Sequence, residues 1–200
     1  MKDINDLLRD NIKTIKAYSS ARDEYKDASS DMVFMDANEN PFQTNVNRYP
    51  DPQQSLVKDY LSEIKGVLTS QILLGNGSDE VLDLLFRAFC EPKQDNVITL
   101  PPTYGMYSVL ADLNAIEIKS VLLDEYFEPK VSEILSTQNV NSKILFLCSP
   151  NNPTANSFNN NKVEELIKNF NGIVVIDEAY IDFSNQESWV SRLNEFSNLI

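Results

Sequence analysis

Polar side chains follow two apolar runs in the second half of the chain. Asn152 lies in a turn shortly after the apolar residues 144–147, and Asp177 and Tyr180 follow the apolar residues 173–176. Ligands of α/β sheets bind outside the carboxyl ends of the strands, so we expect both segments to open onto one crevice. There the acid would hold a ring nitrogen protonated, while the amide and the phenol would hydrogen-bond a ring phenolate. A pyridoxal phosphate ring needs this set of groups.

A turn with two glycines at residues 75–80 is the second candidate site. It joins an apolar segment to the start of a predicted helix, where free N–H groups and the helix dipole favour a phosphate. Ser78 or Asp79 could cap that helix, so a plain tight turn explains the same residues about equally well. A dinucleotide fingerprint would need a third glycine in place of Glu80, and a P-loop would need a lysine near the end of the turn. The sequence therefore excludes both of those phosphate sites.

Tyrosines and turn residues give weaker signals. Tyr104 and Tyr107 follow the predicted strand 97–100, and one aromatic ring placed there could stack on a flat cofactor. Tyrosines at helical spacing are, taken alone, more often packing residues. Residues 36–41 and 48–50 contain prolines and are typical of surface turns.

The composition excludes several classes of function. Seventeen basic and thirty acidic residues give a formal net charge of -13, which argues against a nucleic-acid or anionic-membrane partner. The absence of histidine removes Ser-His-Asp and Cys-His catalysis and most zinc sites, so we expect no metal. Cys90 and Cys148 lie far apart on apolar segments and are expected to be small buried side chains. No apolar run has the length of a membrane span or the form of a secretory signal, which predicts a soluble, cytoplasmic protein.

Helices and strands alternate from about residue 50 onward. Helices are predicted near residues 56–64, 81–89, 104–113 and 162–169, and strands near residues 72–74, 97–100, 116–122, 143–148 and 173–177. Continuous apolar strands between helices favour an α/β fold whose mostly parallel sheet has helices on both faces.

The first part of the chain has a different pattern. Residues 4–18 are predicted to form an amphipathic helix, and a polar stretch follows to residue 31. We therefore expect residues 1–45 to be an N-terminal arm or part of a small domain. Residues 46–200 would then form an incomplete large domain that binds the cofactor.

Taken together, these residues resemble the histidinol-phosphate aminotransferase family of the fold-type-I pyridoxal-phosphate enzymes. Asn-Pro-Thr at residues 152–154 and Asp-Glu-Ala-Tyr at residues 177–180 point to the superfamily. The exact sequences of residues 101–108 and 149–154 point to this branch. The resemblance extends from about residue 35 to the end of the chain. It also includes Ala37-Asn38-Glu39, Arg48-Tyr49-Pro50, and residues 77–80 and 87–92.

The resemblance implies a role for each matching residue. The fold would be the large domain of a fold-type-I transferase. The residues expected to hold pyridoxal 5'-phosphate are Ser78 and Asp79 at the phosphate, Tyr104 stacked on the ring, Asn152 and Tyr180 at the phenolate, and Asp177 at the ring nitrogen. Tyr49 would reach across a homodimer interface to the phosphate region of the neighbouring site. Asn38, Glu39 and Tyr49 would contact substrate as the arm closes.

The implied reaction is a reversible transamination in histidine biosynthesis. Histidinol phosphate and 2-oxoglutarate would be exchanged for imidazole acetol phosphate and glutamate. Two other pyridoxal-phosphate activities stay open, namely an aromatic aminotransferase and an enzyme like threonine-phosphate decarboxylase. A short, non-catalytic module that keeps the fold is the alternative from a different class.

The sequence departs from the family pattern in two respects. Ala155 stands where the family usually has glycine, and a methyl group is tolerated there if that residue need not take a positive φ. The Schiff-base lysine of the family is expected beyond Ile200, since Lys143, Lys162 and Lys168 lie in the wrong context to replace it. We therefore expect the N-terminal part of a longer enzyme, inactive by itself, with the catalytic residue unknown from this sequence.

Overall fold

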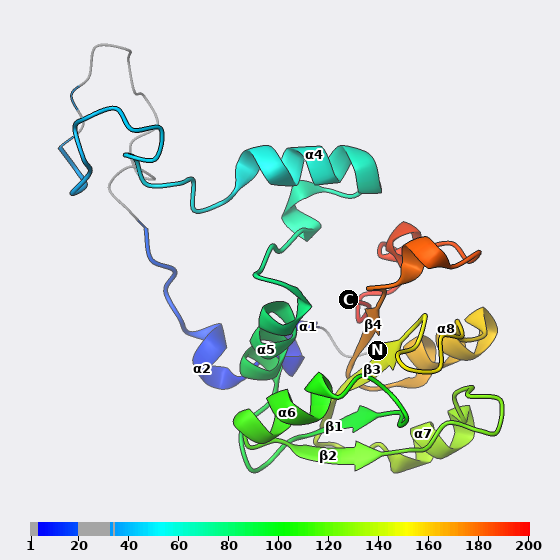
Figure 1. Ribbon diagram of the computed structural model, residues 1–200. Helices are drawn as coiled ribbons and strands as arrows, with labels where there is room; N and C mark the ends of the chain where they lie inside the picture. The colour runs from blue at the N-terminus through cyan, green and yellow to red at the C-terminus, as the bar shows by residue number, and fades with distance from the viewer. Residues whose placement is uncertain (1–3, 20–32, 34) are drawn as a thin grey trace.

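The fold is built on a four-stranded sheet in which every pair of neighbouring strands is parallel. The computed structural model describes residues 4–19, 33 and 35–200. The strands are β1 (Asn96–Thr99), β2 (Glu117–Ser120), β3 (Ser142–Cys148) and β4 (Ile173–Asp177), in the order β2-β1-β3-β4 (Figure 1). The predicted α/β class and parallel sheet are confirmed.

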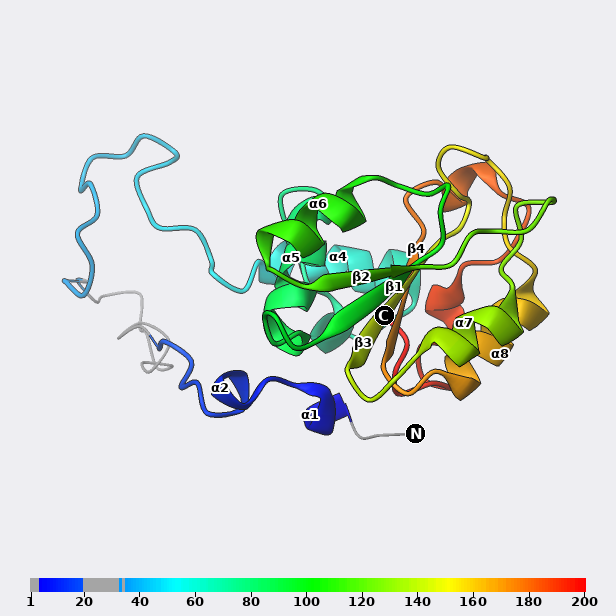
Figure 2. The ribbon, with the colours of Figure 1, turned by 90° about the horizontal axis from the view of Figure 1, so that it is seen from below.

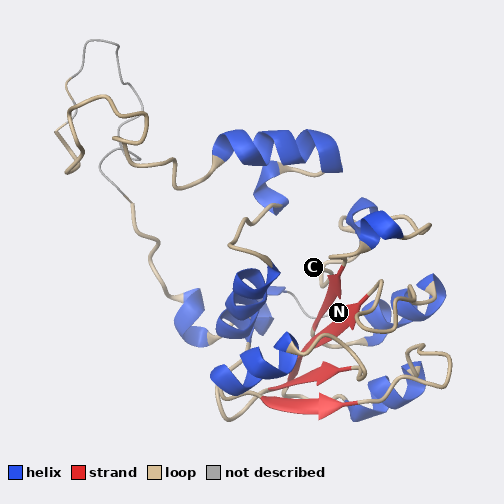
Figure 3. Ribbon diagram, viewed as in Figure 1, coloured by secondary structure: helices blue, strands red, loops and turns tan. Residues whose placement is uncertain are grey.

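Helices cover both faces of the sheet (Figures 2 and 3). One face carries α5 (Ser78–Phe89), α6 (Met106–Leu113) and the short α1 (Ile4–Leu7), and the other carries α7 (Val131–Thr137) and α8 (Asn160–Asn169). Successive strand residues point to opposite faces of the sheet. Phe146 therefore packs into the hydrophobic core under α5 and α6, while Leu145 and Leu147 pack into the core under α7 and α8.

The end of the chain runs beside β4. The N–H of Val174 donates to the carbonyl of Asn198 across 2.9 Å, and the N–H of Ile200 donates back to Val174 across 3.0 Å. Val174 and Leu199 form a parallel bridge. These contacts place residues 198–200 in a strand-like position at the edge of the sheet.

The predicted helix over residues 4–18 is wrong in its length. Two short helices, α1 and α2 (Asp10–Lys13), are separated at Arg9, whose backbone is extended. Tertiary contacts explain the break. The Arg9 N–H donates to the carbonyl of Ala88 across 3.0 Å, and its guanidinium pairs with Glu91 across 2.9 Å. These contacts stabilise a bent chain against the end of α5. The polar stretch predicted to residue 31 lies largely outside the described residues.

Two other expectations also need correction. Residues 72–74 follow the short helix η1 (Thr69–Gln71) but form no strand, because no described strand pairs with them. Helix α7 was not predicted. It is only 7 residues long and Ile134 is its buried residue, so it has no extended helical pattern in the sequence.

Helix α4 (Ser55–Lys65) is where the helical spacing placed it, yet it lies away from the sheet (Figure 1). Its apolar residues Leu56, Tyr60 and Ile64 are 64–85% exposed. The segment 35–50 before it also extends away from the sheet (Figures 1 and 2). Within the described part of the chain, no helix combines the length and the apolar character needed to cross a bilayer.

Candidate functional site

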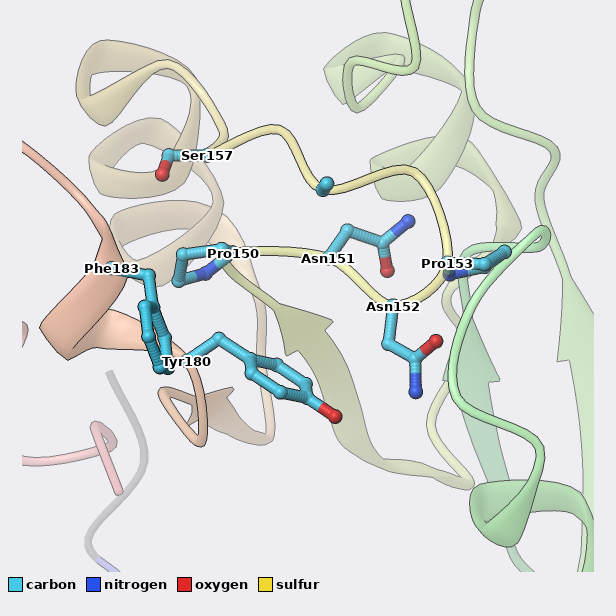
Figure 4. A pocket seen from close by; sticks show the side chains of 8 residues that line it. Pro150, Asn151, Asn152, Pro153, Ser157, Tyr180 and Phe183 are labelled. Atoms are coloured by element: carbon cyan, nitrogen blue, oxygen red, sulfur yellow. The ribbon is translucent and has the colours of Figure 1, made fainter.

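A cavity of about 270 Å³ lies beyond the carboxyl ends of β3 and β4. Figure 4 shows the Asn152 amide and the Tyr180 hydroxyl facing the same space within it. The crevice expected between these two segments is therefore present. Its lining consists of Pro150, Asn151, Asn152, Pro153, Ala155, Ser157, Tyr180 and Phe183, the last from the short helix η2 (Ile181–Phe183).

Asn151 fixes the wall of the cavity. Its side chain is buried, and its amide donates to the carbonyl of Pro102 across 2.9 Å and to the hydroxyl of Thr154 across 2.7 Å. Its Oδ1 accepts from the hydroxyl of Thr103 across 3.0 Å. These bonds join the loop after β3 to the loop after β1, so the neighbouring Asn152 is held at the cavity. Sequence reasoning selected Asn152 and missed Asn151, although two consecutive asparagines between prolines were a usable signal.

Asp177 ends β4, and both of its carboxylate oxygens accept hydrogen bonds. The hydroxyl of Tyr107 donates to Oδ2 across 2.7 Å, and the N–H of Ala179 donates to Oδ1 across 3.1 Å. A charged group at the end of a buried strand is costly unless it is hydrogen-bonded, and the Tyr107 hydroxyl gives this carboxylate a partner.

Tyr107 itself is fully buried, and its ring stacks on Phe146 at a centroid distance of 4.7 Å. Burial, followed by the nearby charge of Asp177, raises the pKa of the Tyr107 hydroxyl far above its ordinary value. The hydroxyl therefore stays protonated and acts as a donor. The helical spacing of Tyr107 had indicated a packing residue. That prediction fits the ring, which packs on Phe146, but it did not include the hydrogen bond of the hydroxyl.

The start of α5 is open to an anion. The N-cap is Gly77, at φ +80°, and Ser78 is the first helical residue, so neither Ser78 nor Asp79 is the cap that we predicted. No described side chain caps this end. Its first N–H groups and the helix dipole therefore remain suited to a phosphate.

Tyr104 joins this helix start to the rest of the site. Its hydroxyl donates to Oδ1 of Asp79 across 3.1 Å, and its ring meets that of Tyr107 edge to face at 5.6 Å. Desolvation and then the hydrogen bond to Asp79 raise the pKa of Tyr104, with smaller contributions from the charges of Asp177 and Tyr180. The side chains of Asp79, Asp177 and Tyr180 are thus close enough to Tyr104 to interact with it electrostatically.

The structure brings most of the predicted cofactor residues to this end of the sheet. Asn152 and Tyr180 line the cavity itself, and Asp177 lies at the end of the adjacent strand. Ser78, Asp79 and Tyr104 lie outside the lining. Asp79 is connected to Asp177 through the hydrogen bond and ring contact of Tyr104 and the hydrogen bond of Tyr107.

The arm residues are not brought to the cavity of their own chain. Asn38, Glu39 and Tyr49 belong to the segment that extends away from the sheet (Figures 1 and 2). The Glu39 carboxylate is almost fully buried, accepting from the Arg48 guanidinium and the Tyr49 N–H, each across 2.8 Å. The Tyr49 side chain is exposed. Glu39 therefore holds the Arg48–Tyr49 turn in shape.

Ala155 does not meet the condition under which its methyl group would be tolerated. Its φ is +62°, in the left-handed region that favours glycine. The N–H of Ala155 donates to the carbonyl of Asn151 across 2.7 Å, which closes the turn and sets this backbone conformation. The alanine is therefore strained in the wall of the cavity.

Both cysteines are free and buried, as expected for small apolar side chains. Burial, followed by the charge of Asp95, raises the pKa of Cys90 to about 12. Burial is also the main cause of the raised pKa of Cys148. Both thiols are protonated near neutral pH and are poor nucleophiles.

Known proteins resemble this chain along nearly all of its length. The family described as aminotransferase class I and II matches residues 21–199. The histidinol-phosphate aminotransferase of Flavobacterium psychrophilum is 62% identical over 197 residues, which is 98% of this chain and 57% of that protein. The enzyme of the same name from Flavobacterium johnsoniae is 61% identical over 199 residues, 99% of this chain and 57% of that protein. The chain thus spans rather more than half the length of these curated relatives.

Solved structures share the fold. The histidinol-phosphate aminotransferase of Clostridium acetobutylicum superposes with a TM-score of 0.68 at 23% identity, covering 78% of this chain and 46% of that one. The L-threonine-O-3-phosphate decarboxylase of Porphyromonas gingivalis superposes with a TM-score of 0.63 at 19% identity, covering 76% of this chain and 46% of that one. At such identities these likenesses concern the fold of the fold-type-I transferases. From the match over residues 21–199, the chain belongs to the aminotransferase class I and II family.

Proposed function

We propose that the cavity and the open start of α5 together bind pyridoxal 5'-phosphate, on which enzymes of this family depend. The chemistry of the available groups supports this fit. The Asn152 amide and the Tyr180 hydroxyl face the cavity and make no side-chain hydrogen bond to any described residue. The Asp177 carboxylate has acceptor capacity beyond the two bonds that it accepts. The uncapped first turn of α5 offers N–H groups to the phosphate.

Each residue would then have a defined task. When bound, pyridoxal phosphate supplies the electron sink for transamination. Asp177 would accept the ring N–H and keep the proton on that nitrogen, while Asn152 and Tyr180 would donate to the ring oxygen. The Tyr104 ring would cover one face of the cofactor and exclude water from it. Ser78 and Asp79 would hold the phosphate through their backbone N–H groups.

We propose L-histidinol phosphate as the amino donor and 2-oxoglutarate as the acceptor, giving imidazole acetol phosphate and glutamate in histidine biosynthesis. The observation that carries this substrate assignment is the 62% identity, over 98% of this chain, to a histidinol-phosphate aminotransferase. The likeness to threonine-phosphate decarboxylase is 19% in sequence and concerns the fold, so it does not favour that activity. No observation favours an aromatic aminotransferase or a non-catalytic module.

The active form is proposed to be a cytoplasmic homodimer. The arm supports this assembly, because Tyr49 is exposed and belongs to the segment 35–50, which extends away from the sheet (Figure 1). Such a residue is available to reach a site on a second subunit. The exposed apolar residues of α4 would be covered by the same association.

We propose that none of the three lysines Lys143, Lys162 and Lys168 forms the Schiff base with the cofactor. Lys143 lies near Asp95, with its Nζ 3.9 Å from Oδ2, at the start of β3 and thus at the opposite end of that strand from the cavity. Lys162 pairs with Asp124 and Glu128, each across 3.6 Å, and Lys168 pairs with Glu164 within α8. We further propose that residues 1–200 alone bind the ring without turning over substrate, and turnover by residues 1–200 would contradict this proposal.

The test uses the protein as its gene encodes it, purified and saturated with pyridoxal phosphate. Glutamate formation is measured with histidinol phosphate and 2-oxoglutarate. Parallel reactions contain an aromatic amino acid, or threonine phosphate with carbon dioxide release as the measurement. We expect the highest kcat/KM with histidinol phosphate. Comparable turnover of a competing substrate, or none with histidinol phosphate, would overturn the assignment.

A further inference from the structure

Tyr107 makes a polar contact that its packing role does not require. Its side chain is fully buried and stacks on Phe146, a contact that a phenylalanine would also make. Its hydroxyl, however, donates to Oδ2 of Asp177 across 2.7 Å. The bond joins α6 to the end of β4, 70 residues away in the sequence. A hydroxyl in an apolar core is costly unless it is hydrogen-bonded, and here its partner is a carboxylate of the candidate site.

The two bonds on Asp177 fix the plane of its carboxylate. The N–H of Ala179 holds Oδ1 from within the same turn, whereas Tyr107 holds Oδ2 from a different element. The 3.1 Å bond from Ala179 alone would restrict rotation of the planar carboxylate about its Cβ–Cγ bond from one side only. The buried hydroxyl therefore sets the direction in which the carboxylate presents its remaining lone pairs. Hydrogen bonds to charged groups are also stronger than neutral ones, so this constraint is firm.

We infer that Tyr107 is a positioning residue that aims the Asp177 carboxylate at the ring nitrogen of the bound cofactor. The inference rests on the proposed pyridoxal-phosphate site. Tyr107 would act through Asp177, because its hydroxyl donates to the carboxylate while its ring is packed against Phe146 and Tyr104. Neither the family match nor the sequence pattern assigns it this role.

The test compares Tyr107→Phe, Asp177→Asn and the double variant in the protein as its gene encodes it. Tyr126→Phe is the matched control, because it removes a hydroxyl from a side chain that is 75% exposed. Equilibrium titration with pyridoxal phosphate gives the affinity, and the visible absorption of the bound cofactor reports the environment of its ring. Unfolding curves of the cofactor-free proteins verify that each variant is folded.

Tyr107→Phe is expected to weaken cofactor affinity roughly tenfold, the size of one hydrogen bond to a charged group. It should also change the absorption of the bound cofactor and lower kcat more than it raises KM. In the Asp177→Asn background, Tyr107→Phe should weaken cofactor affinity little further, because the carboxylate through which Tyr107 acts is already absent. Tyr126→Phe should match the wild-type protein.

The outcomes separate this inference from the proposed function. If the wild-type protein binds no pyridoxal phosphate, the proposed function fails, and the inference fails with it. If the wild-type protein binds it and Tyr107→Phe binds equally well with an unchanged spectrum, the inference alone is wrong. Full additivity in the double variant would also overturn it, because Tyr107 would then act independently of Asp177.

A second measurement keeps the hydroxyl in place, so it does not depend on the folding of Tyr107→Phe. Fluorotyrosine at position 107 provides a fluorine resonance beside the carboxylate. This resonance should shift when pyridoxal phosphate is added, and the shift should be lost in Asp177→Asn. An identical shift in both proteins would contradict coupling through Asp177.

Discussion

The Tyr104 hydroxyl donates a hydrogen bond to Oδ1 of Asp79 across 3.1 Å, which joins the loop after β1 to the first turn of α5. The bond connects the residue proposed to stack on the cofactor ring to the helix start proposed to hold its phosphate. Both ends of the cofactor would therefore contact one connected unit. The ring and the hydroxyl of Tyr104 have separable tasks, which two substitutions can distinguish.

Tyr104→Phe keeps the ring and should lower the free energy of unfolding by about 0.5–1 kcal/mol, the net value of one hydrogen bond. It should weaken pyridoxal-phosphate affinity only roughly twofold. Tyr104→Ala also removes the stacking face and should weaken affinity roughly tenfold. Cofactor titration and urea unfolding measure both effects. Equal loss of affinity in the two variants would show that the hydroxyl, and not the ring, is the important group.

Ala155→Gly should stabilise the protein. At φ +62° an alanine carries strain that glycine avoids, and this gain exceeds the greater chain entropy of glycine when unfolded. We expect a gain of about 0.5–1 kcal/mol in urea unfolding. Ala88→Gly within α5 is the control of opposite sign, with an expected loss of about 1 kcal/mol. A loss of stability in both variants would argue against strain at Ala155.

Gly172→Ala should be strongly destabilising. A Cβ on Gly172 would lie 2.4 Å from the carbonyl oxygen of Lys143, a backbone atom that cannot move without disturbing β3. Overpacking of this kind costs about 1–3 kcal/mol. Gly105→Ala is the matched control, because a Cβ there meets no atom within 4 Å and the residue already has φ -71°. Thermal unfolding of the two variants should differ clearly, and similar melting temperatures would contradict the predicted clash.

The ion pairs of Glu164 should make stability depend on acidic pH. Hydrogen bonds from Arg192 and then Lys168 lower the pKa of this carboxyl to about 2, against an ordinary value of 4.5. Because the folded-state pKa is the lower one, the unfolded chain binds more protons between these values. The stabilisation is therefore fully present above pH 4.5 and is lost as the pH falls toward 2.

Glu164→Gln should consequently reduce the loss of stability between pH 4.5 and pH 2, measured as the urea midpoint at several pH values. Glu165→Gln is the control, since the Glu165 side chain makes no ion pair with the described residues. Because the Glu164 pair is near the surface, added salt should weaken the effect. Identical pH profiles for wild type and Glu164→Gln would contradict this assignment.

Local patterns predicted the parts of this fold that have strong periodicity. The buried strand β4 lies at the predicted residues, and α5 and α8 lie close to theirs, because burial on one or both faces leaves a clear apolar pattern. The break at Arg9 could not be predicted, since it depends on a carbonyl and a carboxylate about 80 residues away. Likewise, residues 72–74 have the composition of a strand but lack a described partner.

The residues of the candidate site also fall into those that the sequence predicted and those that it could not. Asp177, Tyr180 and Asn152 were predicted from their positions after apolar strands, and their types limited the chemistry. The hydroxyl of Tyr107 and the amide of Asn151 were missed, because each acts through a contact between loops or elements. A helical tyrosine and a turn asparagine have no distinguishing sequence context until the fold brings their partners close.

The hydrogen bonds of the buried Asn151 have a consequence for the kinetics of association. Its amide is held by the carbonyl of Pro102 and the hydroxyls of Thr103 and Thr154, so the wall of the cavity is already ordered before any ligand arrives. The conformational entropy of this loop is lost during folding and not again on binding. Encounter with a flat, anionic ligand should then proceed in one step, with an observed rate that rises linearly with ligand concentration.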